Sequence, residues 1–520
     1  MKTTFIYTWS RRSLFPLVVT AIALFLLSSP QITMARSATT FYVDSVGGND
    51  SNSGISTSSP WQSLNKVSQQ TFQAGDHILL KDGSKWTGQQ LAPKGSGADG
   101  NPIYIDGYGS GKKPLIAEGG THHAAVYLFN QQYWDISNLE VTNTASSLGD
   151  YRGVYVLGQD AGVLNHFYFH NMNVHDVTGE VKWIKDVGID AAKKTGGIVF
   201  QIQTTKSVKT KFNDILIENS TFTNNSFGSI IIKQASNWWS RSSSTDANWY
   251  PNTNITIRGN YLNHTSDANA CDTIFLAGAQ NALIDSNISV GAGTSGIEME
   301  YGDNITVQHN EISGVVVKAG GGDSNAIDPD LGTTNITVQY NYIHDNNTGM
   351  LLYGANFGMN YVIRYNIFQN NKNRVLDIGN KKGPVYFYNN TIYNKTTKPI
   401  LVYFRSYDNL TGSWYLDNNI FYSMQKGARL DLFAGMGYAY NAYYGPTVPT
   451  GTGGDNHAVT SGPGLVNPGT GGSGIGTLSG YKLLSNSPLK NAGTTMSNNG
   501  GIDFFGTALP SGRPSIGAAQ

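Results

Sequence analysis

The sequence predicts an all-β protein built as a parallel solenoid of short coils, and three observations point to this fold class. A short β-like stretch that ends in Asn, followed by one residue and an apolar residue, recurs through the middle of the chain. Each unit alternates apolar and polar residues with a period of two. Only 13% of the residues are charged, whereas 61 of 520 are Gly, a composition typical of strands and turns and not of long helices.

The repeat is marked by Asn residues that follow one another at intervals of 23 to 31 residues. The clear copies carry Asn260, Asn287, Asn310, Asn341, Asn366, Asn390 and Asn419, and weaker, more widely spaced earlier copies carry Asn138, Asn171 and Asn219. A unit of this length cannot bury an apolar face alone, so the units are expected to stack, one coil each. Asn at a fixed place in each coil suits a turn in left-handed conformation. Stacked Asn side chains can also form a hydrogen-bonded ladder along the axis.

A family resemblance supports this interpretation. Residues 121–445 resemble the right-handed parallel β-helix proteins, a group dominated by secreted polysaccharide lyases and glycoside hydrolases. The opening FYVDSVGGNDSNSG and the ending LLSNSPLKNAG…PSIGAAQ are similar to the terminal segments of such enzymes. The resemblance implies a single-stranded right-handed parallel β-helix over 121–445, with an N-terminal capping region at 38–120 and a C-terminal capping segment at 446–520.

The N-terminus has the pattern of an export signal. Lys2, Arg11 and Arg12 precede an apolar run over 14–27, and the small residues Ala35 and Ser37 follow. The run is short for a membrane span, so residues 1–37 are expected to be a cleaved secretory signal peptide. The mature chain would be secreted and would have no membrane partner.

Composition excludes several other partners. The chain has 35 basic and 35 acidic residues, which argues against nucleic acid as a ligand because phosphate binding needs a basic surface. A lone Cys271 excludes a disulfide framework. We expect a monomer whose partner is a polysaccharide substrate.

Four acidic residues are expected to lie together on the outer face of one sheet. Five segments end in Gly and can be stacked by that residue: IFLAG (274–278), EMEYG (298–302), DPDLG (328–332), MLLYG (350–354) and VLDIG (375–379). This alignment turns the mostly apolar set inward: Phe275, Ala277, Met299, Tyr301, Leu351, Tyr353, Leu376 and Ile378. The other set faces outward and brings Glu298, Glu300, Asp328 and Asp330 onto neighbouring coils, about 4.8 Å apart.

Such crowding of like charge is unfavourable, which suggests a function. The first hypothesis is a glycoside hydrolase in which Glu298, Glu300, Asp328 and Asp330 are catalytic, because paired carboxylates about 5 Å apart, or about 6.5 to 9.5 Å apart, suit the retaining and inverting reactions respectively. The second is a Ca²⁺-dependent polysaccharide lyase in which Asp323, Asp328 and Asp330 hold the ion. The third is a carbohydrate-binding solenoid without catalysis, on which the acids form a solvated stripe.

Residues around the acids are candidates for substrate contact. A long insertion carries Trp238, Trp239 and Trp249, whose rings can stack on sugars, and Lys233, Asp272 and Asp377 are expected to face the same groove. Lys318, Arg374 and Arg405 are further candidate cations for the lyase reaction. A second insertion, VKWIKDVGIDAAKK, is expected to contain a short helix.

Overall fold

The computed structural model describes residue 1 and residues 37–206, 208–379, 382–395, 399–405 and 412–520. The predicted signal peptide therefore lies almost wholly outside the described residues. Residues 38–520 form one compact unit. No helix among the described residues is both long and apolar enough to cross a membrane.

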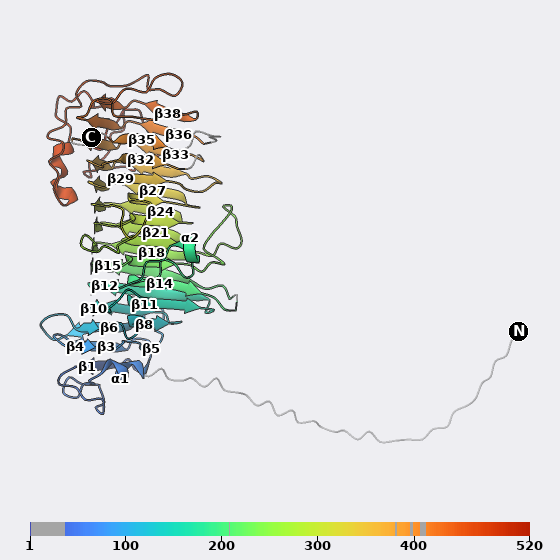
Figure 1. Cartoon of the computed structure of the whole chain (residues 1–520), viewed down its shortest axis with the longest axis vertical. Coiled ribbons are helices and arrows are strands. Elements are labelled where there is room, and N and C mark those ends of the chain that lie inside the picture. Colours follow the sequence, from blue (N-terminus) through green and yellow to red (C-terminus); the bar gives the residue numbers. More distant parts are fainter. Residues whose placement is uncertain (2–36, 207, 380–381, 396–398, 406–411) are drawn as a thin grey trace, which may run out of the picture. The chain divides into compact units, whose positions relative to one another are not determined.

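The unit is a parallel β-helix, as predicted, whose strands stack into three long sheets (Figure 1). Over the described residues, sheet I has 14 strands: β1 (Thr40–Val43), β3 (His77–Lys81), β6 (Ile103–Tyr108), β9 (Trp134–Ser137), β12 (Val163–His170), β15 (Lys211–Glu218), β18 (Asn252–Arg258), β21 (Ala279–Asp285), β24 (Asp303–Gln308), β27 (Thr334–Gln339), β30 (Tyr361–Arg364), β33 (Val385–Tyr388), β36 (Trp414–Asp417) and β38 (Met436–Ala439). Within the same ranges sheet II has 13: β4 (Lys85–Thr87), β7 (Leu115–Ala117), β10 (Glu140–Thr142), β13 (Asn173–His175), β16 (Thr221–Thr223), β19 (Tyr261–Asn263), β22 (Ile288–Val290), β25 (Glu311–Ser313), β28 (Tyr342–His344), β31 (Ile367–Gln369), β34 (Thr391–Asn394), β37 (Ile420–Ser423) and β39 (Ala442–Tyr444).

Sheet III carries the acidic residues. Its strands, in stacking order, are β8 (Ala124–Phe129), β11 (Arg152–Gln159), β14 (Gly196–Gln203), β17 (Gly228–Lys233), β20 (Ile274–Ala277), β23 (Ser295–Glu300), β26 (Asn325–Pro329), β29 (Thr348–Leu352), β32 (Arg374–Ile378) and β35 (Ile400–Phe404). The remaining elements are short: β2 (Thr71–Phe72), β5 (Lys94–Gly95), α1 (Leu64–Ser68), α2 (Ile184–Val187) and the 3-10 helix η1 (Ile475–Tyr481). Helix α2 lies in the insertion where a short helix was expected.

The predicted Asn ladder is confirmed. Asn341 is fully buried; its side-chain amide donates to the side-chain oxygen of Asn366 at 3.0 Å, and its own oxygen accepts from Asn310 at 3.0 Å. The same bond links every step from Asn260 to Asn419, and the ladder continues through Asn441 to Asp455. The ladder supplies hydrogen-bond partners for backbone polar groups that are buried at each turn and need such partners.

We predicted the left-handed turn conformation at the ladder Asn itself, which is one residue too late. The left-handed residue is the one before each ladder Asn, as at His309 (φ 53°) and Tyr340 (φ 58°). In the early coils Asn138, Asn171 and Asn219 occupy that preceding, left-handed position themselves. Asn tolerates the left-handed region and also satisfies buried backbone groups, so the two positions look alike in the sequence.

The chain ends extend along the solenoid. Strands β1, β3 and β6 already belong to sheet I, so the strands continue into the region where we expected an N-terminal cap. Residues 446–520 do more than close the other end, because they pack along the outside of sheet II. The amide of Gly474 donates to Glu311, and the hydroxyl of Tyr481 donates to Gln369, both at 2.6 Å.

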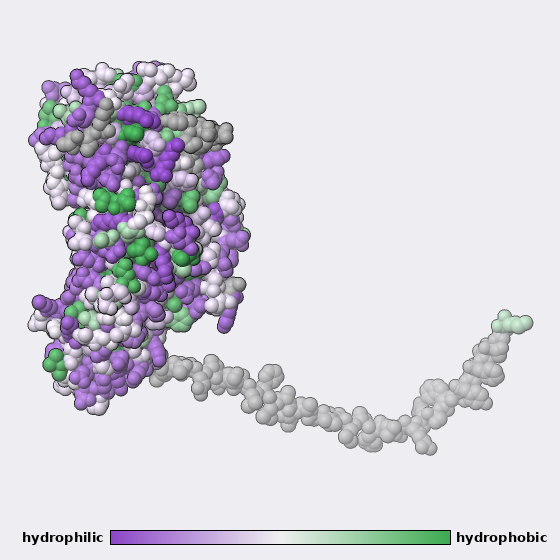
Figure 2. Space-filling view, in the orientation of Figure 1, coloured by the Kyte–Doolittle hydropathy of each residue, from purple (hydrophilic) through white to green (hydrophobic). Residues whose placement is uncertain are grey.

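The surface is mainly polar. Figure 2 shows hydrophilic residues over most of the visible side, with hydrophobic residues in small separate patches. One continuous apolar cluster fills the inside of the coils from Val43 to Tyr443.

Candidate functional site

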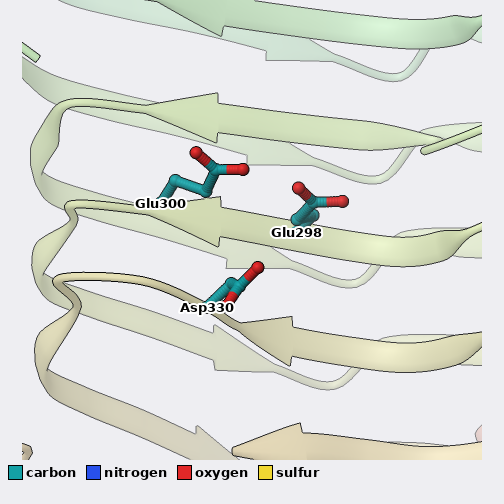
Figure 3. Close-up of side chains that lie close together, drawn as sticks. All are labelled: Glu298, Glu300 and Asp330. Carbon is teal, nitrogen blue, oxygen red and sulfur yellow. The ribbon is translucent and has the colours of Figure 1, made fainter. Parts of the chain in front are cut away.

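The predicted acidic residues lie together on the outer face of sheet III. Glu298 and Glu300 are in β23, and Asp330 follows the end of β26, as Figure 3 shows. Carboxyl oxygens of these three residues lie within 4.8 Å of one another. Asp328 pairs with Glu298 across the two strands. We call these four residues the acid cluster.

The alternation of side chains along a strand explains why the acids face outward. Ile297, Met299 and Ile327 point into the apolar core, so the residues between them must point outward. The predicted directions of Glu298, Glu300, Met299 and Asp328 are therefore confirmed, as are those of Leu376, Ile378 and Asp377 in β32. Tyr301, predicted to face inward, is half-buried outside the core and contacts Trp239.

The prediction was wrong for two other strands. Phe275 pairs with Glu298 and Ala277 with Glu300, so these apolar residues lie outside, and Ile274 and Leu276 lie in the core. In β29, likewise, Met350 and Leu352 lie in the core. The terminal Gly residues are not equivalent from coil to coil: Gly278 follows its strand directly, whereas Tyr301 separates β23 from its Gly. A shift of one residue exchanges the two faces of a strand.

Lys193, which the sequence analysis missed, inserts a buried cation beside the acid cluster. Its ammonium nitrogen lies 2.9 Å from Asp272 and 2.5 Å from Glu298, and it sits over the ring of Phe275 at 4.2 Å from the centroid. Lys193 belongs to the insertion between β13 and β14 that contains α2, and it adopts a left-handed backbone conformation with φ 44°. The only sequence signal was a Lys-containing insertion of unusual length.

Burial and this cation set the protonation states. Burial alone would lower the pKa of Lys193, but the charges of Asp272, Glu298 and Glu300 outweigh it and hold that pKa well above the usual value. Burial raises the pKa of Glu298, but the charge of Lys193 and hydrogen bonds from its neighbours outweigh this and lower it overall. Burial and the negative charge of Glu298 raise the pKa values of Asp272 and Glu300 far above normal. These directions favour the ionised form of Glu298 and the protonated forms of Asp272 and Glu300, both of which are hydrogen-bonding neighbours of Glu298.

Only part of the cluster can meet a ligand. Glu298, Glu300 and Asp328 are 4%, 6% and 1% exposed, respectively, whereas Asp330 is half-buried. Burial, and then the charge of Glu298, raise the pKa of Asp330 to about 7. Asp323, in the turn before β26, is the other accessible acid nearby, with a side chain 40% exposed.

Asp328 is held as a neutral acid. Burial, followed by the charges of Asp330 and Glu298, raises its pKa well above normal. One of its carboxyl oxygens accepts hydrogen bonds from Ser295 at 3.2 Å and Asn325 at 3.0 Å, and the other has no partner among the described residues.

A small pocket of about 210 Å³ adjoins Asp323. Arg405 lies 3.7 Å from Asp323 and binds Asp377 through two hydrogen bonds, at 2.7 and 3.0 Å. Arg374 binds Asp377 from the other side. The two arginines, predicted as free cations, are thus fixed by a buried carboxylate.

Several residues predicted to contact substrate have buried side chains in this structure. Lys233 is fully buried, and its ammonium group donates to backbone carbonyls of the α2 insertion, at Ile189, Asp190 and Ala192. Asp272 is sealed beside Lys193, and Asp377 beside the arginines. Trp238 is 6% exposed and packs into the core.

The other two Trp residues and Lys318 are also engaged. Trp239 is half-buried with its ring 4.8 Å from that of Tyr301, and Trp249 stacks under Arg241 at 4.1 Å. The ammonium of Lys318 donates to the backbone carbonyls of His264, Thr265 and Gly291. Burial, followed by the charges of Glu300 and Asp330, raises the pKa of Tyr301, so Trp239 borders the acid cluster through this ring. The contacts described for Trp249 and Lys318 do not involve the acid cluster.

The acids do not suit the predicted calcium site. Among the described residues, three carboxylates lie close enough together to share an ion, namely Glu298, Glu300 and Asp330. This is not the predicted set of Asp323, Asp328 and Asp330. Ca²⁺ takes six to eight oxygen ligands. Here the ammonium of Lys193, 2.5 Å from Glu298, already supplies a positive charge.

Comparisons with known proteins agree with the fold. Residues 182–330 match a family model described as "Right handed beta helix region", which confirms the predicted resemblance and the handedness. The lacto-N-biosidase of Bifidobacterium longum subsp. longum is 25% identical over 94% of this chain, and the chain spans 37% of that relative.

Solved structures are similar at lower identity. A crystal structure of the GH136 lacto-N-biosidase from Eubacterium ramulus has 22% identity and a TM-score of 0.59, covering 73% of this chain and 67% of that one. The complex of XylC with xylose has 11% identity and a TM-score of 0.50, covering 92% and 98% of the two chains. These structures share the fold of this chain.

Proposed function

We propose that this chain is a glycoside hydrolase that cleaves a glycosidic bond at the accessible edge of the acid cluster. The observation that carries the proposal is the contrast between two accessible acids, Asp323 and Asp330, and the buried carboxyls beside them. A catalytic acid must reach the bond it protonates, so only accessible carboxyls qualify. Asp330 keeps its predicted catalytic role, and Asp323 takes a catalytic role in place of a metal-binding one.

Asp330 suits the general acid. Its pKa of about 7 means that much of it holds a proton near neutral pH, which a general acid needs. Its backbone is fixed, because its amide donates to Met299 at 2.9 Å and its carbonyl accepts from the Thr333 hydroxyl at 2.6 Å. The side chain therefore projects from a rigid position at the end of β26.

Asp323 suits the second carboxylate, which acts as nucleophile or base. Burial raises its pKa overall, although Arg405, 3.7 Å away, opposes part of that rise. Asp323 also interacts electrostatically with Asp330 and raises the pKa of that residue. The two carboxyls have different charged neighbours, Arg405 beside Asp323 and Glu298 beside Asp330, as an acid and a base require.

The remaining acids position the pair. Burial and then the negative charge of Glu298 raise the pKa of Asp330, and Lys193 fixes Glu298. In this proposal Glu298, Glu300 and Asp328 act through Asp330 and do not touch substrate. This arrangement also accounts for four acids crowded on two coils in a chain with little charge.

The curated relative's name suggests the first substrate to test, a glycan with a lacto-N-biose unit. We would incubate the full chain with a chromogenic lacto-N-bioside and with neutral and acidic polysaccharides, and follow released chromophore, reducing ends and ultraviolet absorbance. New reducing ends without absorbance support hydrolysis. An absorbing unsaturated product would identify a lyase, and binding without product would identify a carbohydrate-binding solenoid.

Substitution then assigns the residues. Asp330→Asn and Asp323→Asn should each lower kcat by roughly 10²- to 10⁴-fold, the usual contribution of acid–base catalysis. Asp99→Asn changes an exposed acid far along the chain and should leave kcat unchanged. Full activity of Asp330→Asn would refute this assignment.

We also propose that the chain is exported and that residues 1–37 are removed. The support is the basic, apolar and small-residue pattern of the N-terminus. N-terminal sequencing of protein recovered from the medium of the producing cells should give a start near Ala38, and retention of Met1 would contradict the proposal.

A further inference from the structure

A second pocket lies on the same sheet as the acid cluster but several coils away. It has a volume of about 560 Å³ and opens on the outer face of sheet III over β8, β11 and β14. Its lining includes Tyr127, Tyr151, Tyr155, Asp150, Arg152 and Lys194. Nothing in the proposed reaction uses this pocket.

The floor of the pocket is aromatic. Tyr127 and Tyr155 are neighbours across β8 and β11, with ring centroids 5.6 Å apart. The guanidinium of Arg152 stacks on Tyr155 at 4.1 Å and is only 2% exposed. Its Nε has no hydrogen-bond partner among the described residues, which leaves a donor unused in the wall.

The rim is rigid. Glu118 is fully buried, and its carboxylate accepts hydrogen bonds from the backbone amides of Gly120, Thr121 and His122 at 2.7 to 2.9 Å. The Nδ1 of His122 also lies 2.6 Å from Glu118, which fixes the ring at the mouth of the pocket. A pre-ordered rim lowers the entropic cost of binding a ligand.

The charged groups are partly neutralised. Asp150 lies 2.8 Å from Arg152 and 3.0 Å from Lys194. Two cations and one acid leave a surface with more donors than acceptors. Such a mixture of apolar faces and convergent polar groups is typical of small-ligand sites.

We propose that this pocket is a distal subsite that binds a sugar unit of the glycan cleaved at the acid cluster. The C–H face of a sugar ring would lie on Tyr127 and Tyr155, and its hydroxyl oxygens would accept hydrogen bonds from the cationic side. The inference rests on the proposed function for the identity of the glycan. Along sheet III, β14 lies three strand steps from β23 and β11 lies five steps from β26, or about 14 to 24 Å.

One insertion connects the two sites. The segment between β13 and β14 delivers Lys193 to the acid cluster and the adjacent Lys194 to Asp150 at the pocket. A glycan long enough to occupy both sites spans this insertion. A short substrate reaches the acid cluster alone.

The test measures chain-length dependence. Titration calorimetry on the full chain would use oligosaccharides of increasing length ending in lacto-N-biose, and kinetics would use the short chromogenic lacto-N-bioside. The wild type should bind the longest probe at least 10-fold more tightly than the shortest. Tyr127→Ala and Lys194→Met should each remove this gain and leave kcat/KM for the short substrate within twofold.

Controls separate binding from folding and from catalysis. Tyr415→Ala removes an exposed Tyr from β36 of sheet I and should keep the length dependence; the thermal midpoints of all variants are compared with that of the wild type. Equal affinity for long and short probes, retention of the gain in both pocket variants, or no binding of any probe would overturn the subsite. A wild type that binds long probes in a Tyr127-dependent way but hydrolyses none would overturn the proposed hydrolase and leave the subsite standing.

Discussion

Replacing Lys193 with Met would remove the cation that neutralises the buried acids. Met keeps most of the length of the side chain, so the change is mainly one of charge. Lys193, Asp272 and Glu298 are all at most 5% exposed, and the ammonium contacts both carboxyls directly. Removing one partner of a buried ion pair costs about 3–5 kcal/mol, so we expect a loss of that size in the free energy of unfolding at pH 7.

The loss of free energy of unfolding in Lys193→Met should depend on pH. In the wild type, the lowered pKa of Glu298 stabilises the fold above the pKa of the unfolded chain, and this stabilisation is lost as pH falls through the folded pKa. In Lys193→Met, the folded pKa of Glu298 rises instead. The folded chain then holds a proton that the unfolded chain loses above about pH 4.3, and stability falls by about 1.4 kcal/mol per pH unit. A total of about 3–5 kcal/mol therefore accumulates over roughly 2 to 4 pH units.

The assay is urea unfolding followed by tryptophan fluorescence between pH 5 and pH 8. Lys194→Met is the matched control, because its half-buried ion pair with Asp150 should contribute less than about 1 kcal/mol. Adding Glu298→Gln to Lys193→Met removes the uncompensated charge and should abolish the additional pH dependence that Lys193→Met introduces, leaving that of the other buried acids. A loss below about 1 kcal/mol at pH 7 for Lys193→Met, or a loss that is flat across this pH range, would refute the assignment of Glu298 as the buried anion.

Three further predictions concern the site and the ladder. If Asp330 is the general acid, kcat/KM should fall as pH rises through about 7, and a profile flat to pH 9 would contradict that role. Asn341→Ala should lower the free energy of unfolding by about 2–4 kcal/mol in urea, because several buried hydrogen bonds are lost together, whereas Asn456→Ala, at an exposed turn position, should cost less than about 1 kcal/mol; equal costs would contradict the ladder. Gly332→Ala would place a methyl group 2.0 Å from the ring of Tyr301 at a φ of +70°, so the turn after Asp330 should shift and activity on the chromogenic substrate should fall at least 10-fold; wild-type activity would show that this turn does not position Asp330.

Periodicity was enough to predict the solenoid, because each coil repeats the same local demands. The Asn ladder followed from spacing, and the outward direction of Glu298 and Glu300 followed from Ile297 and Met299 between and beside them. Local alternation determines which face a residue takes only within one strand. Extending the alignment to Phe275 required that the Gly at the end of each segment hold the same position in every coil. The Gly residues do not do so.

Contacts made by insertions could not be predicted. Lys193 lies 79 residues from Asp272 and 105 from Glu298 in the sequence, and no periodic pattern relates an insertion to the coil it covers. The same uncertainty explains Trp238, since an aromatic residue in a long insertion can either face a ligand or fill the core. Lys233 was correctly expected on the outer face, but the α2 insertion covers that face and takes its ammonium group.

The acid cluster avoids most of the repulsion that its composition suggests. Four ionised carboxylates on adjacent coils would repel strongly in a buried setting. Burial instead raises the pKa values of the neighbouring carboxyls, while Lys193 lowers that of Glu298, so the ionised form is favoured for the one carboxyl that the cation pairs with. Burial and the charge of Glu298 together raise the pKa of Asp330, and Lys193 fixes the position of Glu298. The α2 insertion therefore acts on the proposed chemistry from outside the repeat, and losing its cation should alter stability and the protonation of the general acid together.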